Sequence, residues 1–362
     1  MYLEKVFLKG FRNYKEAEAS FLKGVNIIYG ENAQGKTNLL EAIYILTNGY
    51  SYRFCNNNQL INNSMTSFYL KGIFYRLDQE KVEMEVSSSR NDVKILKVNG
   101  KRVREMENFL GNINTILYSP DDLKIVQEGP VERRRYINIE ISKMRPKYYF
   151  YLSNYNKILK QRNYLLKRMK NDFKGSDLIE ILDYQLAEFG INIIKERKNF
   201  IEKLSRISKD MHHFITGGRE VLDIKYKCDL PEPNKEEYIK ILSKRRNLDI
   251  ERGMTSVGPH RDEIIFLING MDSRFYGSQG QKKTVVITLK LSQMQLFKEE
   301  TSGYPILLLD DIFSELDEKR RNYILENLCE SQVIITDTEP IKVSVKGYDN
   351  VRYIKIVDGT IY

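Results

Sequence analysis

The sequence has few cysteines, and those present follow no metal-binding or redox spacing. Cys55, Cys228 and Cys329 are odd in number and far apart, and no C-x-x-C pair occurs. This pattern argues against a secreted domain held together by disulfides and against a cysteine-based zinc site. It indicates a reducing compartment.

Long apolar runs are also missing. No stretch approaches the roughly 20 residues that a membrane-spanning helix needs. Glu4, Lys5 and Lys9 interrupt the N-terminal region, where a signal peptide would carry its apolar segment. We therefore expect a cytoplasmic protein that does not enter a membrane.

Acidic residues are outnumbered by basic ones. The chain has 58 Lys and Arg against 49 Asp and Glu, which gives a formal net charge of +9 and a pI of about 9.1. A positive surface favours polyanionic partners such as nucleic acids. Many lysine-rich soluble proteins bind no nucleic acid, however, so the motifs must decide.

The two ends of the chain have an α/β pattern. The run 25–29 is apolar, ends at Gly30, and is followed by apolar residues at helical spacing over 38–46. Further short strands are expected near 68–74, 82–86 and 95–98, with a hairpin turn at Asn99-Gly100. Strand patterns return at 264–268, 305–309, 333–336 and 351–357.

The middle of the chain is rich in Lys, Glu, Leu, Ile and Tyr at helical spacing, and we interpret it as a separate helical domain. We expect a discontinuous α/β domain over 1–130 and 250–362, with a helical lid domain inserted at 131–249. Heptads are not sustained long enough for an extended coiled coil.

One glycine-rich turn matches G-x-x-x-x-G-K-T between a predicted strand and a predicted helix. It reads Gly30-Glu31-Asn32-Ala33-Gln34-Gly35-Lys36-Thr37. Backbone N–H groups of such a loop surround phosphate oxygens, Lys36 reaches the β and γ phosphates, and Thr37 offers a hydroxyl to Mg²⁺. The loop predicts ATP as ligand and Mg²⁺ as its metal.

An apolar run at 305–309 ends in two acids, Asp310 and Asp311. A buried parallel strand would deliver both carboxylates at its C-terminal end, beside the phosphate loop. We predict that Asp310 holds Mg²⁺ and that Asp311 orients the attacking water. Lys36 and Asp311 are the predicted catalytic residues.

Two further stretches are typical of ABC ATPases. Ser278-Gln279-Gly280-Gln281 precedes an amphipathic helix and has the pattern of the ABC signature. Ser314-Glu315-Leu316-Asp317 follows the acidic pair as the D-loop does. The four elements stand in the ABC order, which predicts an ABC-type P-loop ATPase head.

Together these motifs resemble the RecF family of bacterial recombination mediators, which belongs with the SMC-like ABC ATPases. The resemblance spans the whole chain. It is carried by Gly10-Phe11-Arg12-Asn13-Tyr14, the phosphate loop through Leu40, Ser119-Pro120-Asp121-Asp122-Leu123, Gly129-Pro130 with Arg133-Arg134-Arg135, Gly258-Pro259-His260-Arg261-Asp262, residues 277–281 and residues 308–317.

The resemblance implies a nucleotide-driven clamp of DNA repair, recombination and replication-fork maintenance. ATP would be held between two copies of the chain, by the P-loop of one and the signature of the other. Such proteins bind duplex or gapped DNA and work with RecR and RecO in loading RecA. Slow, DNA-stimulated hydrolysis of ATP to ADP and phosphate would reset the clamp.

Carried onto this chain, the resemblance assigns nucleotide contacts in one copy and signature contacts in the other. The first set is Arg12, Gly30, Glu31, Asn32, Ala33, Gln34, Gly35, Lys36, Thr37 and Asn38; the second is Ser278, Gly280 and Gln281. The metal ligands would be Thr37 and Asp310.

The chain departs from the wider ABC pattern at three positions. Asp337 or Thr338 stands where transporters keep a switch histidine. The catalytic acid Asp311 is one methylene shorter than the usual Glu, which is consistent with slow turnover. No plain Q-loop glutamine is visible, and Gln127 is a candidate.

Basic residues cluster in the helical segment and suit a surface that follows phosphates without reading bases. A solvated helix face explains the same pattern. The candidate DNA contacts are Arg133, Arg134, Arg135, Lys157, Lys160, Arg162, Lys167, Arg168 and Lys170. Binding of this kind would ignore base sequence and weaken steeply with salt.

His260 has two interpretations: a polar turn residue, or a contact near the signature at a dimer interface. Two other functions also use the same phosphate chemistry. An ABC transporter subunit is disfavoured by the absent switch histidine and by the basic helical insertion. A structural SMC-like tether is disfavoured by the absence of a long heptad array.

Overall fold

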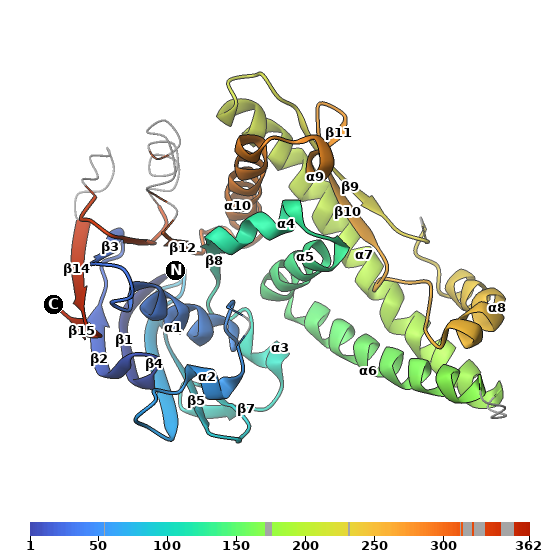
Figure 1. Cartoon of the computed structure of the whole chain (residues 1–362), viewed down its shortest axis with the longest axis horizontal. Helices are drawn as coiled ribbons and strands as arrows, with labels where there is room; N and C mark the ends of the chain where they lie inside the picture. The colour runs from blue at the N-terminus through green and yellow to red at the C-terminus, as the bar shows by residue number, and fades with distance from the viewer. Residues whose placement is uncertain are drawn as a thin grey trace. The chain divides into compact units, whose positions relative to one another are not determined.

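The computed structural model describes residues 1–53, 55–170, 176–230, 232–311, 313, 321, 330–341 and 351–362 (Figure 1). They form two compact units. Residues Met1–Asp122 and Ile287–Tyr362 make up the first, and Leu123–Val286 the second. The first unit is therefore built from both ends of the chain.

An antiparallel sheet with strand order β2-β1-β4-β5-β6-β7 forms one layer of the first unit. Burial alternates along β4 and β5, as it does when one face of a sheet packs on a core. The predicted Asn99-Gly100 turn joins β6 to β7, with φ of 50° and 74°. The strands are β1 (Tyr2–Phe11), β2 (Tyr14–Ser20), β4 (Ser67–Tyr75), β5 (Lys81–Ser89), β6 (Ile95–Val98) and β7 (Lys101–Val103).

A second sheet has the order β15-β14-β3-β13-β12-β8, and its inner pairs are parallel. Three neighbouring strands are almost continuously apolar and buried, because both faces are covered. The strands are β3 (Val25–Tyr29), β8 (Thr115–Tyr118), β12 (Ile306–Asp310), β13 (Val333–Asp337), β14 (Val351–Val357) and β15 (Thr360–Ile361).

Helix α1 (Lys36–Asn48) contacts strands of both sheets and shares their hydrophobic core. Most of its side chains are buried, which requires the apolar run around Leu39, Ile43 and Leu46. The helix ends at Gly49, whose φ of 76° is the left-handed cap that glycine favours. Short helices α2 (Asn57–Leu60), α3 (Met106–Phe109) and η1 (Pro120–Leu123) complete this unit.

The second unit is mainly helical, as predicted. Helices α6 and α7 pack along each other, and α7 also contacts α8 (Figure 1). The helices are α4 (Lys124–Gln127), α5 (Pro130–Met144), α6 (Pro146–Met169), α7 (Ser176–Ile215), α8 (Lys235–Arg252) and α9 (Ser273–Tyr276). Helix α10 (Gln279–Thr301) contains the boundary between the two units.

The second unit also contains a small sheet that the sequence did not predict in full. Its order is β11-β10-β9, with β10 (Glu263–Ile268) between β9 (Leu222–Lys227) and β11 (Met271–Asp272). The sequence predicts β10. It misses β9, whose alternation of Leu222, Ile224 and Tyr226 is short and lies between two helical stretches.

The predicted domain boundaries and the compact units differ at two places. Residues 123–130 and 250–286 were assigned to the ATPase domain, and they group with the second unit. A compact unit is defined by spatial contacts and a domain by independent folding, so the boundaries at 130 and 250 stay a prediction.

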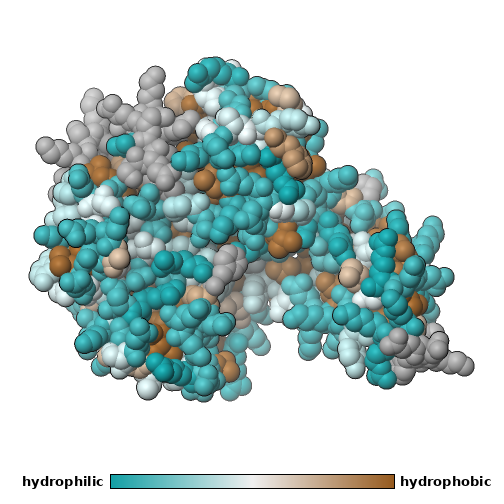
Figure 2. Space-filling view, in the orientation of Figure 1, coloured by the Kyte–Doolittle hydropathy of each residue, from teal (hydrophilic) through white to brown (hydrophobic). Residues whose placement is uncertain are grey.

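The face drawn in Figure 2 is mostly hydrophilic, and its apolar side chains lie in small separate groups. Across the part of the chain that the structure describes, no helix combines the length and the apolar character needed to cross a membrane. The cytoplasmic location stays a prediction.

Candidate functional site

The glycine-rich loop follows β3 and leads directly into α1. Its backbone has φ of 153° at Gly30 and 120° at Gly35, which favours glycine. A Cβ at Gly30 would lie 2.4 Å from the carbonyl oxygen of Ile356, and one at Gly35 would lie 2.6 Å from the side-chain nitrogen of Asn13. Larger residues are therefore excluded at both positions, as a phosphate-binding loop requires.

Two turns brace this loop. Asn13 Nδ2 donates to the Gln34 carbonyl at 2.9 Å, and the Tyr14 hydroxyl donates to the Gly35 carbonyl at 2.9 Å. From the other side, the Gly359 N–H donates to the Gln34 carbonyl at 3.1 Å. The β1–β2 and β14–β15 turns thus fix the loop, although no local pattern predicts that the second of them reaches it.

The amino group of Lys36 folds back over the loop. Its Nζ donates to the carbonyl oxygens of Gly30 at 2.6 Å and of Glu31 at 2.8 Å. Gly35, the N-cap of α1, has no side chain to bond the first N–H groups, and the first turn holds no acidic residue. Free helix N–H groups and a lysine together favour phosphate oxygens.

The remaining predicted nucleotide contacts of the loop are accessible to a ligand. Glu31, Asn32 and Ala33 are exposed, and Gln34, Thr37 and Asn38 are partly exposed. The loop is therefore open to solvent over most of its length.

Three carboxylates gather at the C-terminal ends of β12 and β13. Burial lowers the pKa of Lys36, and Asp311, Asp337 and Asp310 act in the opposite direction, so all three lie within electrostatic reach of its amino group. Carboxylate oxygens and the Thr37 hydroxyl are the hard donors that Mg²⁺ prefers. These donors suit a magnesium ion that is also bound by phosphate oxygens, because no three His, Cys, Asp or Glu side chains among the described residues are placed to hold a metal by themselves.

Asp310 is held by two hydrogen bonds. The Tyr52 hydroxyl donates to its Oδ2 at 2.7 Å, and Thr336 Oγ1 donates to its Oδ1 at 3.0 Å. Burial and the neighbouring Asp310 carboxylate raise the pKa of Tyr52 well above its ordinary value, so the phenol stays protonated and donates. Sequence reasoning missed both partners, because neither belongs to a known motif.

Asp311 adopts the left-handed conformation, with φ of 54°, and is exposed. Its N–H donates to Thr336 Oγ1 at 2.9 Å. Asp tolerates this conformation better than most residues. Its exposure at the end of β12 gives solvent access to the carboxylate, which a group that orients water requires.

Asp337 ends β13, between the strand that leads into the P-loop and the strand that carries Asp310. Its Oδ1 accepts the N–H groups of Thr338 at 2.7 Å and Glu339 at 3.3 Å. Its buried Oδ2 has no hydrogen-bond partner within the described residues. Asp337, one of the two residues predicted for the switch position, therefore has one oxygen available to a ligand or water.

Arg12 is held against α1. Its guanidinium forms two hydrogen bonds with the buried carboxylate of Glu41, at 2.9 and 2.8 Å, and a third with the Gln59 carbonyl at 2.9 Å. Arg53 also approaches Glu41 and donates to Asn38 Oδ1 at 2.9 Å. Arg53, which the sequence analysis did not select, is thus tied to the end of the P-loop.

The signature forms a capping box at the start of α10. The Ser278 N–H donates to Gln281 Oε1 at 2.8 Å, and the Gln281 N–H donates to Ser278 Oγ at 3.2 Å. Ser278 and Gly280 are exposed, and Gln281 is partly exposed. The turn is thus pre-formed and presents its small residues to solvent.

The Q-loop candidate lies beside the signature. Gln127 Nε2 donates to Gln279 Oε1 at 2.9 Å, within the second unit. The predicted D-loop, Ser314 to Asp317, lies outside the described residues.

His260 has a structural environment. Its Nδ1 lies 2.7 Å from the Tyr155 hydroxyl, and its Nε2 lies 3.0 Å from the Thr255 carbonyl oxygen. Burial is the main cause that lowers its pKa to about 4. A neutral ring that donates to Thr255 and accepts from Tyr155 satisfies both contacts, which favours the first interpretation, a polar turn residue.

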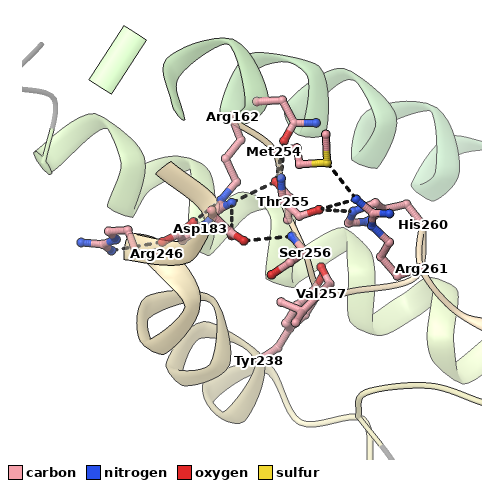
Figure 3. Close-up of polar contacts among 12 residues, drawn as sticks. Arg162, Asp183, Tyr238, Arg246, Met254, Thr255, Ser256, Val257, His260 and Arg261 are labelled. Carbon is pink, nitrogen blue, oxygen red and sulfur yellow. Dashed lines mark hydrogen bonds and ion pairs between the residues drawn. The ribbon is translucent and has the colours of Figure 1, made fainter. Parts of the chain in front are cut away.

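Arg162 belongs to the core of the second unit instead of a surface that DNA could contact. Its side chain is fully buried and pairs with Asp183 at 2.6 Å and Asp249 at 2.8 Å (Figure 3). Arg246 also reaches Asp183, at 3.1 Å. The assignment of Arg162 as a DNA contact is therefore corrected: a buried charge needs its partners, and α6 turns this face inward.

The other basic candidates divide into two groups. Arg133 is buried and pairs with Glu263 at 2.9 Å, while Arg134 and Arg135 are partly exposed. The basic residues on the outer face of α6 and just after it are exposed: Lys157, Lys160, Lys167, Arg168 and Lys170.

Comparison with known proteins places this arrangement in a family. Residues 2–355 match the family model described as RecF/RecN/SMC N terminal domain. The DNA replication and repair protein RecF of Acetivibrio thermocellus is 38% identical over 370 residues and covers 100% of both chains. The chain belongs to the RecF family.

A second RecF relative, the DNA replication and repair protein RecF of Caldanaerobacter subterraneus subsp. tengcongensis, is 42% identical and covers 100% of this chain and 99% of that protein. The solved structure of the recombination mediator protein RecF-ATP in the RecFOR pathway is 41% identical, with a TM-score of 0.92, and covers 100% of this chain and 97% of that one. The predicted RecF resemblance is thereby confirmed.

A more distant match shows the fold alone. The Smc head domain from Pyrococcus furiosus is 19% identical, with a TM-score of 0.57, and covers 99% of this chain and 95% of that one. Together with the RecF structures, it confirms the predicted fold class: an ABC-type P-loop ATPase head with an inserted, mainly helical segment.

Proposed function

We propose that this chain is an ATP-dependent DNA-binding protein of recombinational DNA repair and replication-fork maintenance. Two copies would close around ATP and grip duplex or gapped DNA, and slow, DNA-stimulated hydrolysis would open them again. The observation that carries the proposal is the combination of a braced P-loop, an acidic strand end and an exposed signature in one RecF-family chain.

Nucleotide binding rests on residues of the first unit. The N–H groups at the start of α1 and the amino group of Lys36 bind phosphate oxygens. When the nucleotide binds, Lys36 gives up its hydrogen bonds to the carbonyl oxygens of Gly30 and Glu31 and donates to phosphate oxygens instead. Thr37 and Asp310 would hold Mg²⁺, which when bound neutralises phosphate charge. Asp311 orients water toward the terminal phosphate, and Tyr52 keeps Asp310 in position.

The second copy would complete the site with its signature. The capping box holds the Ser278 and Gly280 backbone in the form that receives phosphate oxygens at a helix N-terminus. Phe275 and Tyr276, immediately before this turn, are 69% and 72% exposed. Large exposed aromatic residues beside a polar turn suit a surface that becomes covered when two copies associate.

DNA binding is assigned to the exposed basic face of α6. Lys157, Lys160 and Lys167 recur at helical spacing on that face, and Arg168 lies beside Lys167. These cations fit a phosphate backbone and carry no base-reading pattern. Work with RecR and RecO in loading RecA is part of the same proposal, supported by the relatives described in the RecFOR pathway.

The transporter and tether alternatives receive no support from particular contacts. Asp337, in the place of a switch histidine, and the α6–α7 helix pair both separate this chain from a transporter subunit. The longest described helix, α7, has 40 residues and packs within the second unit, so it does not form an extended tether arm.

The test measures association and DNA retention together. With Mg²⁺ and ATP, light scattering should show a dimer, and labelled gapped duplex should bind more tightly than without nucleotide. Lys36→Ala should remain monomeric, and Lys23→Ala, an exposed lysine elsewhere in the first unit, should behave as the parent chain. A parent chain that stays monomeric at saturating ATP would overturn the proposal.

A further inference from the structure

A groove of about 780 Å³ lies between α7 and β9 in the second unit. One wall is a single face of α7, on which Ile201, Ser205 and Lys209 recur at helical spacing; the other is the run 224–228. Its volume is within the range of sites that bind ligands, about 300 to 1,000 Å³. None of the residues assigned above to nucleotide, metal or DNA lines it.

No described strand pairs with the outer edge of β9, although Ser205 of α7 already bonds one backbone group there. Within the described residues, β9 is the last strand of its sheet and pairs with β10 alone. The Ile224 N–H donates to Ser205 Oγ at 3.1 Å, so it points away from β10 and toward α7. Alternate residues direct their backbone groups to the same side, so Tyr226 presents its N–H and C=O along this edge.

The rim of the groove is basic. The cationic side chains that line it are Lys198, Arg206, Lys209, Lys225 and Lys227, and all are exposed. Glu202 is the only carboxylate in the lining. Lys209, Lys225 and Lys227 form no ion pair with any described residue, so their charge is available to an acidic partner.

The floor is apolar. Tyr226 and Cys228 are partly buried on the same face of β9 as the buried Ile224, beside Ile201 of α7, and the partly buried Ile265 lies on the opposite face as the cross-strand partner of Lys225. Burial raises the pKa of the Cys228 thiol, so this side chain stays neutral and acts as a small apolar group. The groove thus combines a strand edge, an apolar floor and a positive rim.

We propose that this groove binds an extended acidic segment of a partner protein, in which acidic and apolar side chains alternate. The segment pairs with the Tyr226 backbone on the outer edge of β9, next to the Ser205 contact, and places its apolar side chains beside the apolar lining and its carboxylates against the lysines. A nucleic acid backbone would match the lysines but leave the strand edge and the apolar floor unused. The charge pattern and the backbone edge together therefore favour a peptide.

The experiment uses the full chain and a short fluorescent peptide in which Glu alternates with Val and Phe. Saturable binding is expected by fluorescence anisotropy, independent of ATP. A peptide with Lys in place of Glu, and one N-methylated on alternate backbone nitrogens, should both fail to bind. Lys225→Glu combined with Lys227→Glu should weaken binding at least about tenfold, because like charges then face each other.

Two further variants keep the result interpretable. Lys209→Glu lies on α7, where an exposed substitution leaves β9 intact, and should weaken binding several-fold. Lys240→Glu with Lys244→Glu, exposed on α8 outside the groove, should leave the affinity unchanged. The proposal is overturned if the peptide does not bind, if the α8 pair weakens it equally, or if the groove variants abolish binding of duplex DNA and spare the peptide.

Discussion

Tyr52 and Thr336 orient Asp310, the proposed metal ligand, although neither belongs to a recognised motif. Tyr52 follows α1 and stands 258 positions before its partner in the chain. Its hydroxyl occupies one carboxylate oxygen of Asp310, and Thr336 bonds the other. At the residue scale, hydrogen bonds to both carboxylate oxygens therefore fix the orientation of the Asp310 side chain.

Replacing Tyr52 by Phe should weaken the response to magnesium. Loss of one hydrogen bond to a charged carboxylate costs about 1.5 to 3 kcal/mol, or roughly a tenfold to 150-fold change. We expect the Mg²⁺ concentration for half-maximal binding of a fluorescent ATP analogue to rise by that factor. Tyr69→Phe removes a similar bond, to Glu85 at 3.0 Å, and should leave the titration unchanged. Equal titrations of both variants would contradict a positioning role for Tyr52.

Replacing Asp311 by Asn should separate binding from hydrolysis. The carboxylate is exposed after β12, so its loss leaves the P-loop intact while removing the group that orients water. We expect ATP to bind with nearly unchanged affinity, turnover to fall at least about 100-fold, and an ATP-bound dimer to persist in light scattering. A monomeric variant in excess ATP would count against this role.

His260 should make the second unit sensitive to acid. Its pKa falls from 6.5 to about 4 on burial, so the unfolded chain binds the proton more readily. The neutral ring contributes stability that is complete above pH 6.5 and is lost as the pH falls toward 4. At pH 5 the loss is about 2 kcal/mol.

Urea unfolding at pH 7 and pH 5 measures this effect. His260→Gln should be less stable at pH 7 and should lose less stability between the two values. His213→Gln, at an exposed position of α7, should retain the pH dependence of the parent chain. An unchanged pH dependence in His260→Gln would show that other groups cause the acid sensitivity.

At the scale of elements, helix α6 has one face that packs inside the second unit and one face that is exposed to solvent. Arg162 points into the unit and joins α6 to α7 and α8 through Asp183 and Asp249. Lys157 and Lys160, less than two turns away, are exposed. A charge pattern alone does not separate these faces, because arginine and lysine have the same sign on both.

Replacing Arg162 by Met should destabilise the second unit by about 3 to 5 kcal/mol, because buried Asp249 loses its ion-pair partner and Asp183 keeps only Arg246. Lys157→Met, on the exposed face, should stay within about 0.5 kcal/mol of the parent. Urea unfolding followed by circular dichroism makes the comparison. A folded Arg162→Met of parental stability that binds DNA weakly would restore this arginine as a DNA contact.

At the scale of the whole molecule, the proposed function needs surfaces from two copies of the chain. Ser278 and Gly280 are exposed at the start of α10, and the phosphate loop is open at Glu31 to Ala33. Closing two copies would bring such surfaces together and exclude water from the phosphates.

Replacing Ser278 by Arg should block this association. The long cation breaks the capping box with Gln281 and fills the space that a phosphate would take. We expect ATP binding by the monomer to persist, because the P-loop is untouched, and ATP-dependent dimers to disappear in light scattering. Ser302→Arg, beyond the end of α10, is the matched control and should dimerise normally. A Ser278→Arg chain that dimerises as well as its control would refute a signature contact in the partner copy.

Local chemistry determined what the sequence could predict. The P-loop, the acidic strand end and the signature each occupy a few consecutive residues, so their glycines, hydroxyls and carboxylates fix the ligand type before folding. The period of apolar residues likewise predicted β3, α1 and the helical middle. Each of these features depends on residues that are close together in the chain, and such residues can be recognised from the sequence alone.

Tertiary structure alone decided which distant residues meet and which side chains are buried. The bracing of Gln34 by Gly359, the bond from Tyr52 to Asp310 and the burial of Arg162 join segments that are remote in the chain. A hydrogen bond or an ion pair depends on distance and dehydration, and both follow only when the helices and sheets pack. Motif composition therefore determined the chemistry, and packing determined the orientation of the groups that perform it.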